Sequence, residues 1–253
     1  MREFTGRSTS VLITEADLQV FTVPQVWELV DQADVLYESF KELMGTEPTG
    51  NGPLRIAFVD NCGAGCGYIG AKGIELQPYF ANGGAWFARG DIPDLYPYLV
   101  HEMTHNFDRW SAYVMFGPDA GHAWTSFMDA YVVVANQQGQ SDTSANSLGY
   151  TPAEFLKKRL DEFFGPYAGT PGATWTNCVR DASCTNLNST TVQGGFAARL
   201  AQLTGDAGTR QALAELKKAA TTRGLSPAAM TPEQKNDLLI ECFSRGAKTN
   251  LGR

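Results

Sequence analysis

The sequence predicts an α+β protein, in which a small mixed β-sheet lobe is followed by a mainly helical lobe. Segments with the residue pattern of strands occur only before residue 90, whereas helical periodicity dominates after residue 94. The chain of 253 residues is also long enough to bury a sizeable core. We therefore expect a sheet-and-helix lobe over residues 1–110 and a helical lobe over 111–253, which together form one unit.

In the first lobe, the clearest prediction is a helix over residues 24–44. Pro24 stands at a favoured first position, apolar residues recur at helical spacing, and Gly45 marks the end. Strands are predicted where short runs of apolar residues alternate with polar ones. The strand candidates cover residues 10–14, 54–60, 68–77 and 84–89, and a turn rich in glycine and cysteine covers 61–67.

Helical patterns take over from residue 94. Asp94 can cap a first helix over residues 94–108, and a loop containing Gly117 and Pro118 leads into a second helix over 121–136. The apolar periodicity then continues to the end of the chain. The further helices that it predicts cover residues 152–164, 194–203, 207–223 and 232–247.

Charge and hydropathy exclude several classes of partner. The net charge of −7 and the pI near 5.0 argue against nucleic acid or an anionic membrane as the main partner. No apolar run approaches the roughly 20 residues that span a bilayer. The N-terminus shows no hydrophobic signal core, although a mature or excised piece of a secreted protein would lack one as well. We expect a monomer without a membrane span.

The five cysteines favour an oxidising compartment. Cys62 and Cys66 can close one small disulfide loop, and Cys178 and Cys184 can close another. Cys242 is then left single within an apolar helix. Reduced thiols, or a second metal site, are the alternatives, but the spacing is not C-x-x-C and no histidine is near either pair. The sequence therefore predicts two disulfides and secretion.

Residues 101–105 read His-Glu-Met-Thr-His. On a helix, His101 and His105 lie one turn apart on the same face and can offer two imidazole nitrogens to one metal ion. Glu102 lies one step round the helix, close to the metal. This is the arrangement of zinc peptidases, in which two histidines bind Zn²⁺ and the glutamate accepts a proton from the metal-bound water. All three histidines of the chain fall between residues 101 and 122, which argues against a chance pair.

Catalytic zinc usually has three protein ligands and one open position for water. The third ligand must come from outside the first helix, and His122, at the start of the second, has the right chemistry. Asp129 is the next candidate, and Asp119 and Asp108 are the remaining ones.

Two of these carboxylates suit a supporting role better. Asp129 follows His122 by two helical turns on the same face, within a largely apolar helix where an acid is expected to have a partner. Such a carboxylate can hold the far ring nitrogen of a histidine ligand and fix its tautomer. Asp108 lies one turn beyond His105 and is expected to orient a ligand in the same way.

The stretch from residue 98 to 131 resembles the enhancin and mucin-degrading zinc metallopeptidases of the gluzincin clan. The resemblance rests on His101-Glu-Met-Thr-His105-Asn106, on Trp110, on a glycine-containing loop and on a helix ending in Tyr131. In layout it extends over residues 24–251. It implies a zincin-like metallopeptidase fold, a bound Zn²⁺, and secreted glycoprotein or mucin-like substrates. The family's closing helices continue further, so the chain is expected to be part of a larger secreted protein.

The same resemblance bears on the third ligand. In that family a glutamate that opens the second helix binds the zinc, and this position holds His122. Alignment on thermolysin-like enzymes instead places the ligand on Thr125, a poor zinc ligand, and the supporting aspartate on Asp129. The expected glutamate is absent in both alignments.

The sequence thus predicts a secreted zinc endopeptidase that acts on proteins or glycoproteins. Glu102 is expected to take the proton from water and pass it to the leaving amine. Tyr113 and Tyr131 are both candidates for the donor to the oxyanion. One alternative is a related module that binds a peptide or glycoprotein with little or no turnover, which the missing glutamate ligand favours and the intact Glu102 disfavours. Another is a zinc hydrolase that acts on a non-peptide bond.

Overall fold

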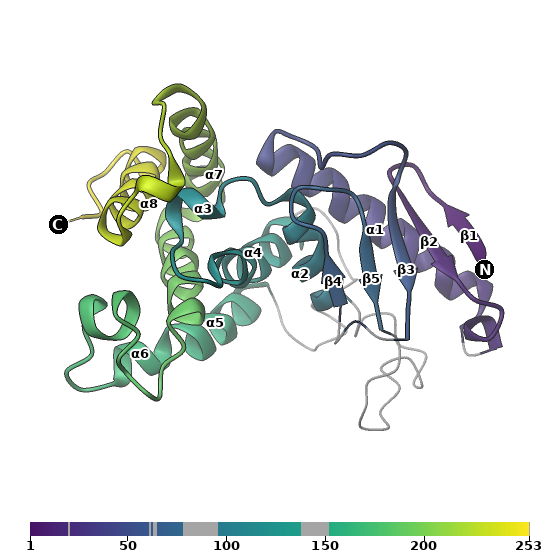
Figure 1. Cartoon of the computed structure of the whole chain (residues 1–253), viewed down its shortest axis with the longest axis horizontal. Coiled ribbons are helices and arrows are strands. Elements are labelled where there is room, and N and C mark those ends of the chain that lie inside the picture. The colour runs from purple at the N-terminus through teal and green to yellow at the C-terminus, as the bar shows by residue number, and fades with distance from the viewer. Residues whose placement is uncertain (20, 61, 63–64, 78–95, 138–151, 253) are drawn as a thin grey trace. The chain divides into compact units, whose positions relative to one another are not determined.

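The protein is α+β, as the sequence predicts (Figure 1). The computed structural model describes all residues except 20, 61, 63–64, 78–95, 138–151 and 253. The chain divides into two compact units, one containing Met1–Phe107 and the other containing Asp108–Ala135 and Thr151–Arg253. The structure thus divides the chain after Phe107, whereas the sequence predicts a division after residue 110.

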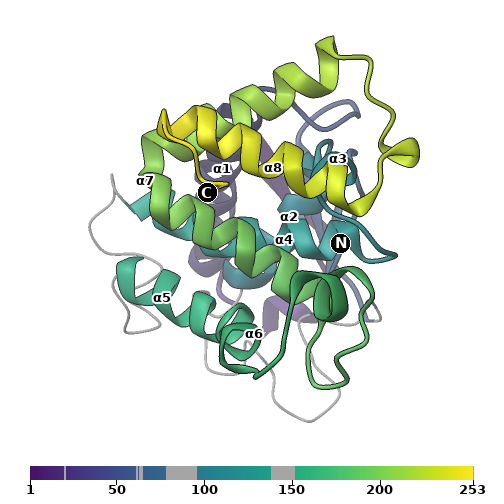
Figure 2. The ribbon, with the colours of Figure 1, turned by 90° about the vertical axis from the view of Figure 1, so that its left-hand side faces the viewer.

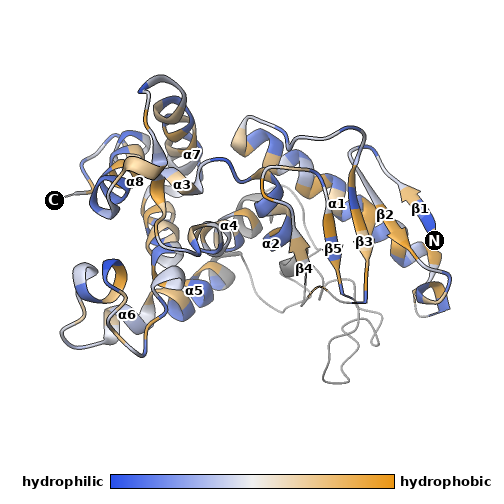
Figure 3. Ribbon diagram, viewed as in Figure 1, coloured by the Kyte–Doolittle hydropathy of each residue, from blue (hydrophilic) through white to orange (hydrophobic). Residues whose placement is uncertain are grey.

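The first unit contains a mixed five-stranded sheet with the order β1-β2-β3-β5-β4 (Figure 1). The three central strands run parallel to one another, while β1 and β4 are antiparallel to their neighbours. Apart from Thr9 and Ser10 at the start of β2, the buried side chains of β2, β3 and β5 are apolar, and these strands carry much of the orange in Figure 3. The strands are β1 (Arg2–Thr5), β2 (Thr9–Ile13), β3 (Leu54–Phe58), β4 (Gly65–Gly67) and β5 (Ile74–Leu76).

The strand predictions for residues 10–14 and 54–60 are confirmed by β2 and β3. The prediction of a strand over 68–77 is wrong for its first half, because Tyr68–Gly73 forms the turn between β4 and β5, with hydrogen bonds from Ala71 N to Tyr68 O and from Tyr68 N to Gly73 O. The predicted turn over 61–67 contains β4 instead. The sequence analysis missed β1, and the strand candidate over 84–89 lies outside the described residues.

Helix α1 (Val23–Met44) confirms the predicted helix over 24–44 and packs against β2. Its ends are set by local chemistry. Thr22 and Gln25 form a capping box at the start, and Gly45 adopts a left-handed conformation at the end, with φ of 58°. The apolar face of the helix is buried, and Phe40 stacks on Phe107 with ring centroids 5.3 Å apart.

A buried aspartate fastens α1 to the turn between β1 and β2. The carboxylate of Asp34 accepts hydrogen bonds from the backbone N–H groups of Arg7, Ser8 and Thr9, at 2.6, 3.0 and 2.8 Å, and from the Thr9 hydroxyl at 2.8 Å. Burial alone would raise the pKa of Asp34, but these hydrogen bonds outweigh it and hold the pKa below its ordinary value. The charged form of Asp34 therefore stabilises this unit.

The second unit is helical in its described part. Its main feature is the pair α7 and α8, which lie side by side in Figures 1 and 2. They approach closely where Gly246 meets Gly208: a Cβ at position 246 would lie only 2.1 Å from the Gly208 carbonyl oxygen. The helices of this unit are α3 (Ser111–Val114), α4 (Ala120–Gln137), α5 (Pro152–Phe163), α6 (Gly165–Gly169), α7 (Ser189–Thr222) and α8 (Pro232–Ala247), with a π-helical turn at Trp175–Arg180.

The helices predicted over 121–136, 152–164 and 232–247 are confirmed by α4, α5 and α8. Helix α7 includes both segments predicted over 194–203 and 207–223, and the predicted break between them is a kink at Gly205, with φ of 68°. The helix begins earlier than predicted, because Asn188 caps it by accepting a hydrogen bond from Thr191 N. The short helices α3 and α6 were not predicted.

Both predicted disulfides are present. Cys62 is bonded to Cys66, and Cys178 is bonded to Cys184, with Cα atoms 6.0 and 4.8 Å apart. Cys242 is a free, buried thiol on α8, and burial raises its pKa to about 12. No helix in the described part of the chain is both long enough and apolar enough to cross a membrane.

Candidate metal centre

Helix α2 (Tyr96–Phe107) carries the His-Glu-x-x-His motif, which confirms a helix within the range 94–108. Asp94, its predicted cap, lies outside the described residues. As the spacing requires, the rings of His101 and His105 are neighbours, with centroids 5.1 Å apart and planes at 81°. His105 is 7% exposed, and His101 is partly buried. The helix therefore presents two imidazoles side by side.

The third histidine belongs to the same group. One ring nitrogen from each of His101, His105 and His122 lies within 4.8 Å of the others. His122 stands in the first turn of α4 and is exposed.

None of the carboxylates that the sequence suggests as alternative ligands belongs to this group in the part of the chain that the structure describes. Asp119 lies in the exposed turn before α4. Asp129 is half-buried on α4, two turns after His122, as its predicted supporting role requires. That role remains a prediction.

The edge strand β4 packs against α2 at Glu102. A Cβ at Gly67 would lie 2.2 Å from the backbone oxygen of Glu102 and 3.0 Å from Cβ of His105. A Cβ at Gly65 would lie 2.7 Å from Oε1 of Glu102. At Gly67 the obstacle is backbone, so only glycine fits there, and the close approach of the strand leaves Glu102 only 5% exposed. The sequence predicts these glycines as part of a turn, and nothing in their spacing indicates the contact with the glutamate.

Asn106 fixes α2 to the turn between β4 and β5. Its side-chain amide donates to the carbonyl oxygens of Ala71 and Gly73, both at 2.8 Å, with a longer contact of 3.2 Å to that of Tyr68. In return, Gly70 N donates to the carbonyl oxygen of His105 at 3.0 Å. Asn106 is fully buried. Hydrogen bonds on both sides thus hold the histidine-bearing helix and the turn in one register.

Asp108 has a local role that differs from the predicted one. Its carboxylate accepts hydrogen bonds from Ser111 N at 3.0 Å and from the Ser111 hydroxyl and the Trp110 backbone. Burial raises the pKa of Asp108, and these hydrogen bonds oppose the shift. The side chain therefore caps the start of α3. Its predicted role in orienting a histidine remains a prediction.

The two tyrosines proposed as oxyanion donors differ in their surroundings. Tyr131 is buried on α4, and its hydroxyl donates to Asp206 Oδ1 at 2.7 Å, while Asp206 also pairs with Arg210. This bond ties α4 to α7 and gives Tyr131 a structural role. Tyr113 is half-buried on α3, next to Trp110. Its predicted role remains a prediction.

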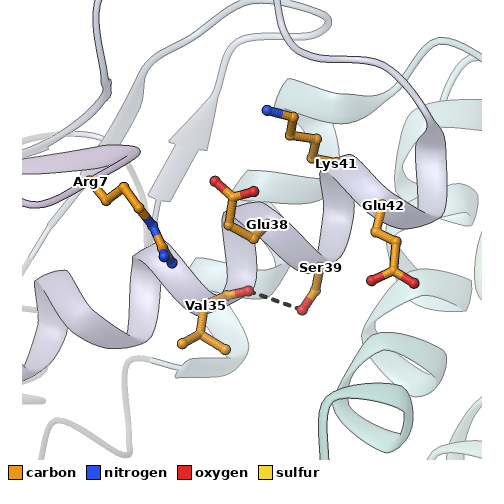
Figure 4. A pocket seen from close by; sticks show the side chains of 6 residues that line it. All are labelled: Arg7, Val35, Glu38, Ser39, Lys41 and Glu42. Carbon is orange, nitrogen blue, oxygen red and sulfur yellow. Dashed lines mark hydrogen bonds between the residues drawn. The ribbon is translucent and has the colours of Figure 1, made fainter.

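A shallow surface hollow lies elsewhere, along α1 of the first unit (Figure 4). Its lining mixes both signs of charge, and the Ser39 hydroxyl is satisfied by the carbonyl oxygen of Val35 at 2.9 Å. No residue of the histidine group contributes to it. The lining residues are Arg7, Val35, Glu38, Ser39, Lys41 and Glu42.

Comparison of the chain with protein-family models and with curated proteins finds no match. Function is therefore inferred from the residues of the site itself.

Proposed function

We propose that the chain is a zinc-dependent endopeptidase whose metal is held by His101, His105 and His122. The observation that carries the proposal is the group of three imidazole nitrogens within 4.8 Å of one another, beside a glutamate on the same helix. Three nitrogen donors with one position left open form the ligand set of catalytic zinc. The two disulfides support a secreted protein, for which extracellular proteins or glycoproteins are the proposed substrates.

Zinc bound at such a site polarises a carbonyl group and lowers the pKa of coordinated water towards neutrality. The protein's own contribution centres on Glu102. Its carboxylate takes a proton from the attacking water and delivers it to the nitrogen of the leaving amine. Packing by Gly65 restricts where this carboxylate can lie, and the bonds of Asn106 hold the helix that carries it. Positioning of this kind lowers the cost of bringing the reacting groups together.

The first test is metal content, measured by mass spectrometry on the native chain and on His122→Ala and Asp129→Ala. We expect about one zinc ion per chain, lost in His122→Ala and retained at least in part by Asp129→Ala. Asp119→Ala is a matched control, because this exposed aspartate precedes the same helix and lies outside the histidine group. Full zinc content in His122→Ala would remove this residue from the ligand set.

The second test concerns Glu102. Glu102→Gln keeps the shape of the side chain but cannot accept the proton, so zinc content should stay at the native level while peptide hydrolysis falls by about 10²–10⁴-fold. Full activity in this variant contradicts the role of Glu102 as the base.

A binding module with little or no turnover is the second candidate. It is favoured by the tight cover of β4 over Glu102, which is only 5% exposed. One experiment distinguishes the two functions: peptide binding and peptide cleavage are both measured on the native chain loaded with zinc. Binding without cleavage indicates a binding module. In that case Glu102→Gln should leave the affinity for the peptide unchanged.

A further inference from the structure

We propose a second metal site, formed by Cys62, Cys66 and Glu75, that takes a soft divalent cation such as Zn²⁺ or Cd²⁺ when the Cys62–Cys66 disulfide is reduced. The two sulfur atoms and a carboxylate oxygen of Glu75 lie within 4.8 Å of one another. This group shares no residue with the three histidines. The inference therefore holds or fails independently of the proposed peptidase function.

The sheet places these side chains together. Cys66 on β4 is paired directly with Glu75 on β5 in the antiparallel register. Directly opposed residues of an antiparallel pair point to the same face of the sheet, with Cβ atoms about 4.5–5.5 Å apart. Cys62 is held at the same place by its bond to Cys66. The arrangement thus depends on strand pairing, which the cysteine spacing alone does not reveal.

Neighbouring polar groups hold the ligand atoms in place. The Tyr68 hydroxyl donates to Oε1 of Glu75 at 3.1 Å, and Cys62 N donates to Oε1 of Gln77 at 3.5 Å. The first bond leaves the other carboxylate oxygen free to bind a cation, and it orients the group as hydrogen bonds to metal-bound carboxylates generally do. The second bond keeps the neutral amide oxygen of Gln77 beside Cys62.

The chemistry of the three donors selects the cation. Thiolates favour Zn²⁺ and other soft metals, and two thiolates with one carboxylate leave a fourth tetrahedral position for water. Cys66 is exposed and Glu75 is half-buried, so an ion can enter from solvent. The other disulfide offers no equivalent, because in the described part of the chain Cys178 and Cys184 are not grouped with a third ligand, and Cys178 is fully buried.

The redox state decides which form exists. In the disulfide the two sulfur atoms are bonded to each other, so neither is a thiolate that can bind a cation. A dithiol reductant supplies two electrons and two protons, the S–S bond breaks, and two thiols form while the reductant becomes a cyclic disulfide. Binding of the cation then releases both thiol protons. The oxidised chain therefore cannot bind a cation through these two sulfur atoms, whereas the reduced chain can.

The test is titration of the full-length chain with Cd²⁺, followed through the ultraviolet charge-transfer absorption of cadmium–thiolate bonds. Histidine ligands do not produce this band, and the Cd²⁺ that the three-histidine group takes up is measured by equilibrium dialysis with the oxidised protein and subtracted. The titration uses protein reduced with an excess of a phosphine, beside the oxidised protein. Both are prepared with Cys178→Ser and Cys184→Ser, so that the second pair adds no thiols.

We expect the band to saturate near one Cd²⁺ per reduced chain and to be absent from the oxidised chain. Cys66→Ser should abolish the saturable band, and Glu75→Gln should weaken the apparent affinity by about tenfold or more. Glu3→Gln is a matched control, because this glutamate lies on the opposite edge strand and should leave the affinity unchanged. No band in the reduced chain, or the native affinity in Glu75→Gln, would overturn the proposal.

Discussion

Gly67 offers a sharp test of how the histidine-bearing helix is held. The residue is not in a left-handed conformation, so alanine suits its backbone angles. If the position were open, Gly67→Ala would stabilise the protein by about 0.4–1 kcal/mol, because it restricts the unfolded chain. The structure predicts the opposite sign, since the added methyl carbon would lie 2.2 Å from the carbonyl oxygen of Glu102.

The magnitude follows from what must move. Ordinary contact begins at 3.4 Å, so β4 and α2 must separate locally by about 1 Å, and the atom in the way belongs to the backbone. Overpacking of this kind costs about 1–3 kcal/mol. We expect the loss for Gly67→Ala to lie near the upper end of this range, because the added methyl would also lie only 3.0 Å from Cβ of His105. Gly65→Ala should cost less, since its methyl meets the flexible side chain of Glu102 instead.

The assay is urea unfolding followed by circular dichroism. With a slope of about 3 kcal/mol per molar urea, a loss of 3 kcal/mol lowers the midpoint by about 1 M. Gly169→Ala is the control, because a Cβ there meets nothing within 4 Å and its φ is not positive. Its midpoint should stay level or rise. A midpoint for Gly67→Ala at or above that of the native chain would refute the close packing of β4 on α2.

Three further predictions concern the supports of the two units. Asn106→Asp replaces an amide donor with a carboxylate that faces two carbonyl oxygens at 2.8 Å, and should lower the unfolding free energy by about 3 kcal/mol in the same assay. Asp34→Asn should lower the free energy of unfolding by about 2 kcal/mol at pH 7. Because the pKa of Asp34 in the folded protein lies below the ordinary 3.8, the stabilisation by its charged form is complete above pH 3.8 and is lost as the pH falls through the folded pKa. The unfolding free energies of the two proteins should therefore converge in acid. Gly246→Ala places a methyl 2.1 Å from the oxygen of Gly208 and should lower the thermal midpoint of the helical unit, whereas an unchanged midpoint contradicts the close crossing of α7 and α8.

The sequence predicted best where the structure is fixed by neighbouring residues. The limits of α1 follow from Thr22 and Gly45, which act within one turn of the helix ends. The pairing of His101 with His105 follows from helical spacing alone. His122 was predicted from its chemistry, as the remaining histidine near the motif, and its role as a ligand remains a prediction.

The prediction failed where long-range pairing decides. Strands β4 and β5 are three residues each, too short for alternation to show, and they exist because they pair with each other and, through β5, with β3. Asp108 was predicted from its spacing to orient a histidine, and its hydrogen bonds to Ser111 at the start of a helix of only four residues were not predicted. Such a helix gives no periodic signal, and its cap cannot be told from any other aspartate.

The short strand β4 also explains why glycine and cysteine alternate over residues 65–67. Gly65 and Gly67 turn towards α2, where an added Cβ would lie 2.7 Å from Oε1 of Glu102 at position 65 and 2.2 Å from the backbone oxygen of Glu102 at position 67. Cys66, between them, must therefore point to the opposite side of the strand, where it meets Glu75 of β5. One strand thus limits the position of Glu102 through its two glycines and carries a thiol on its other face. A change in the redox state of Cys66 consequently acts on the strand that packs against the predicted base.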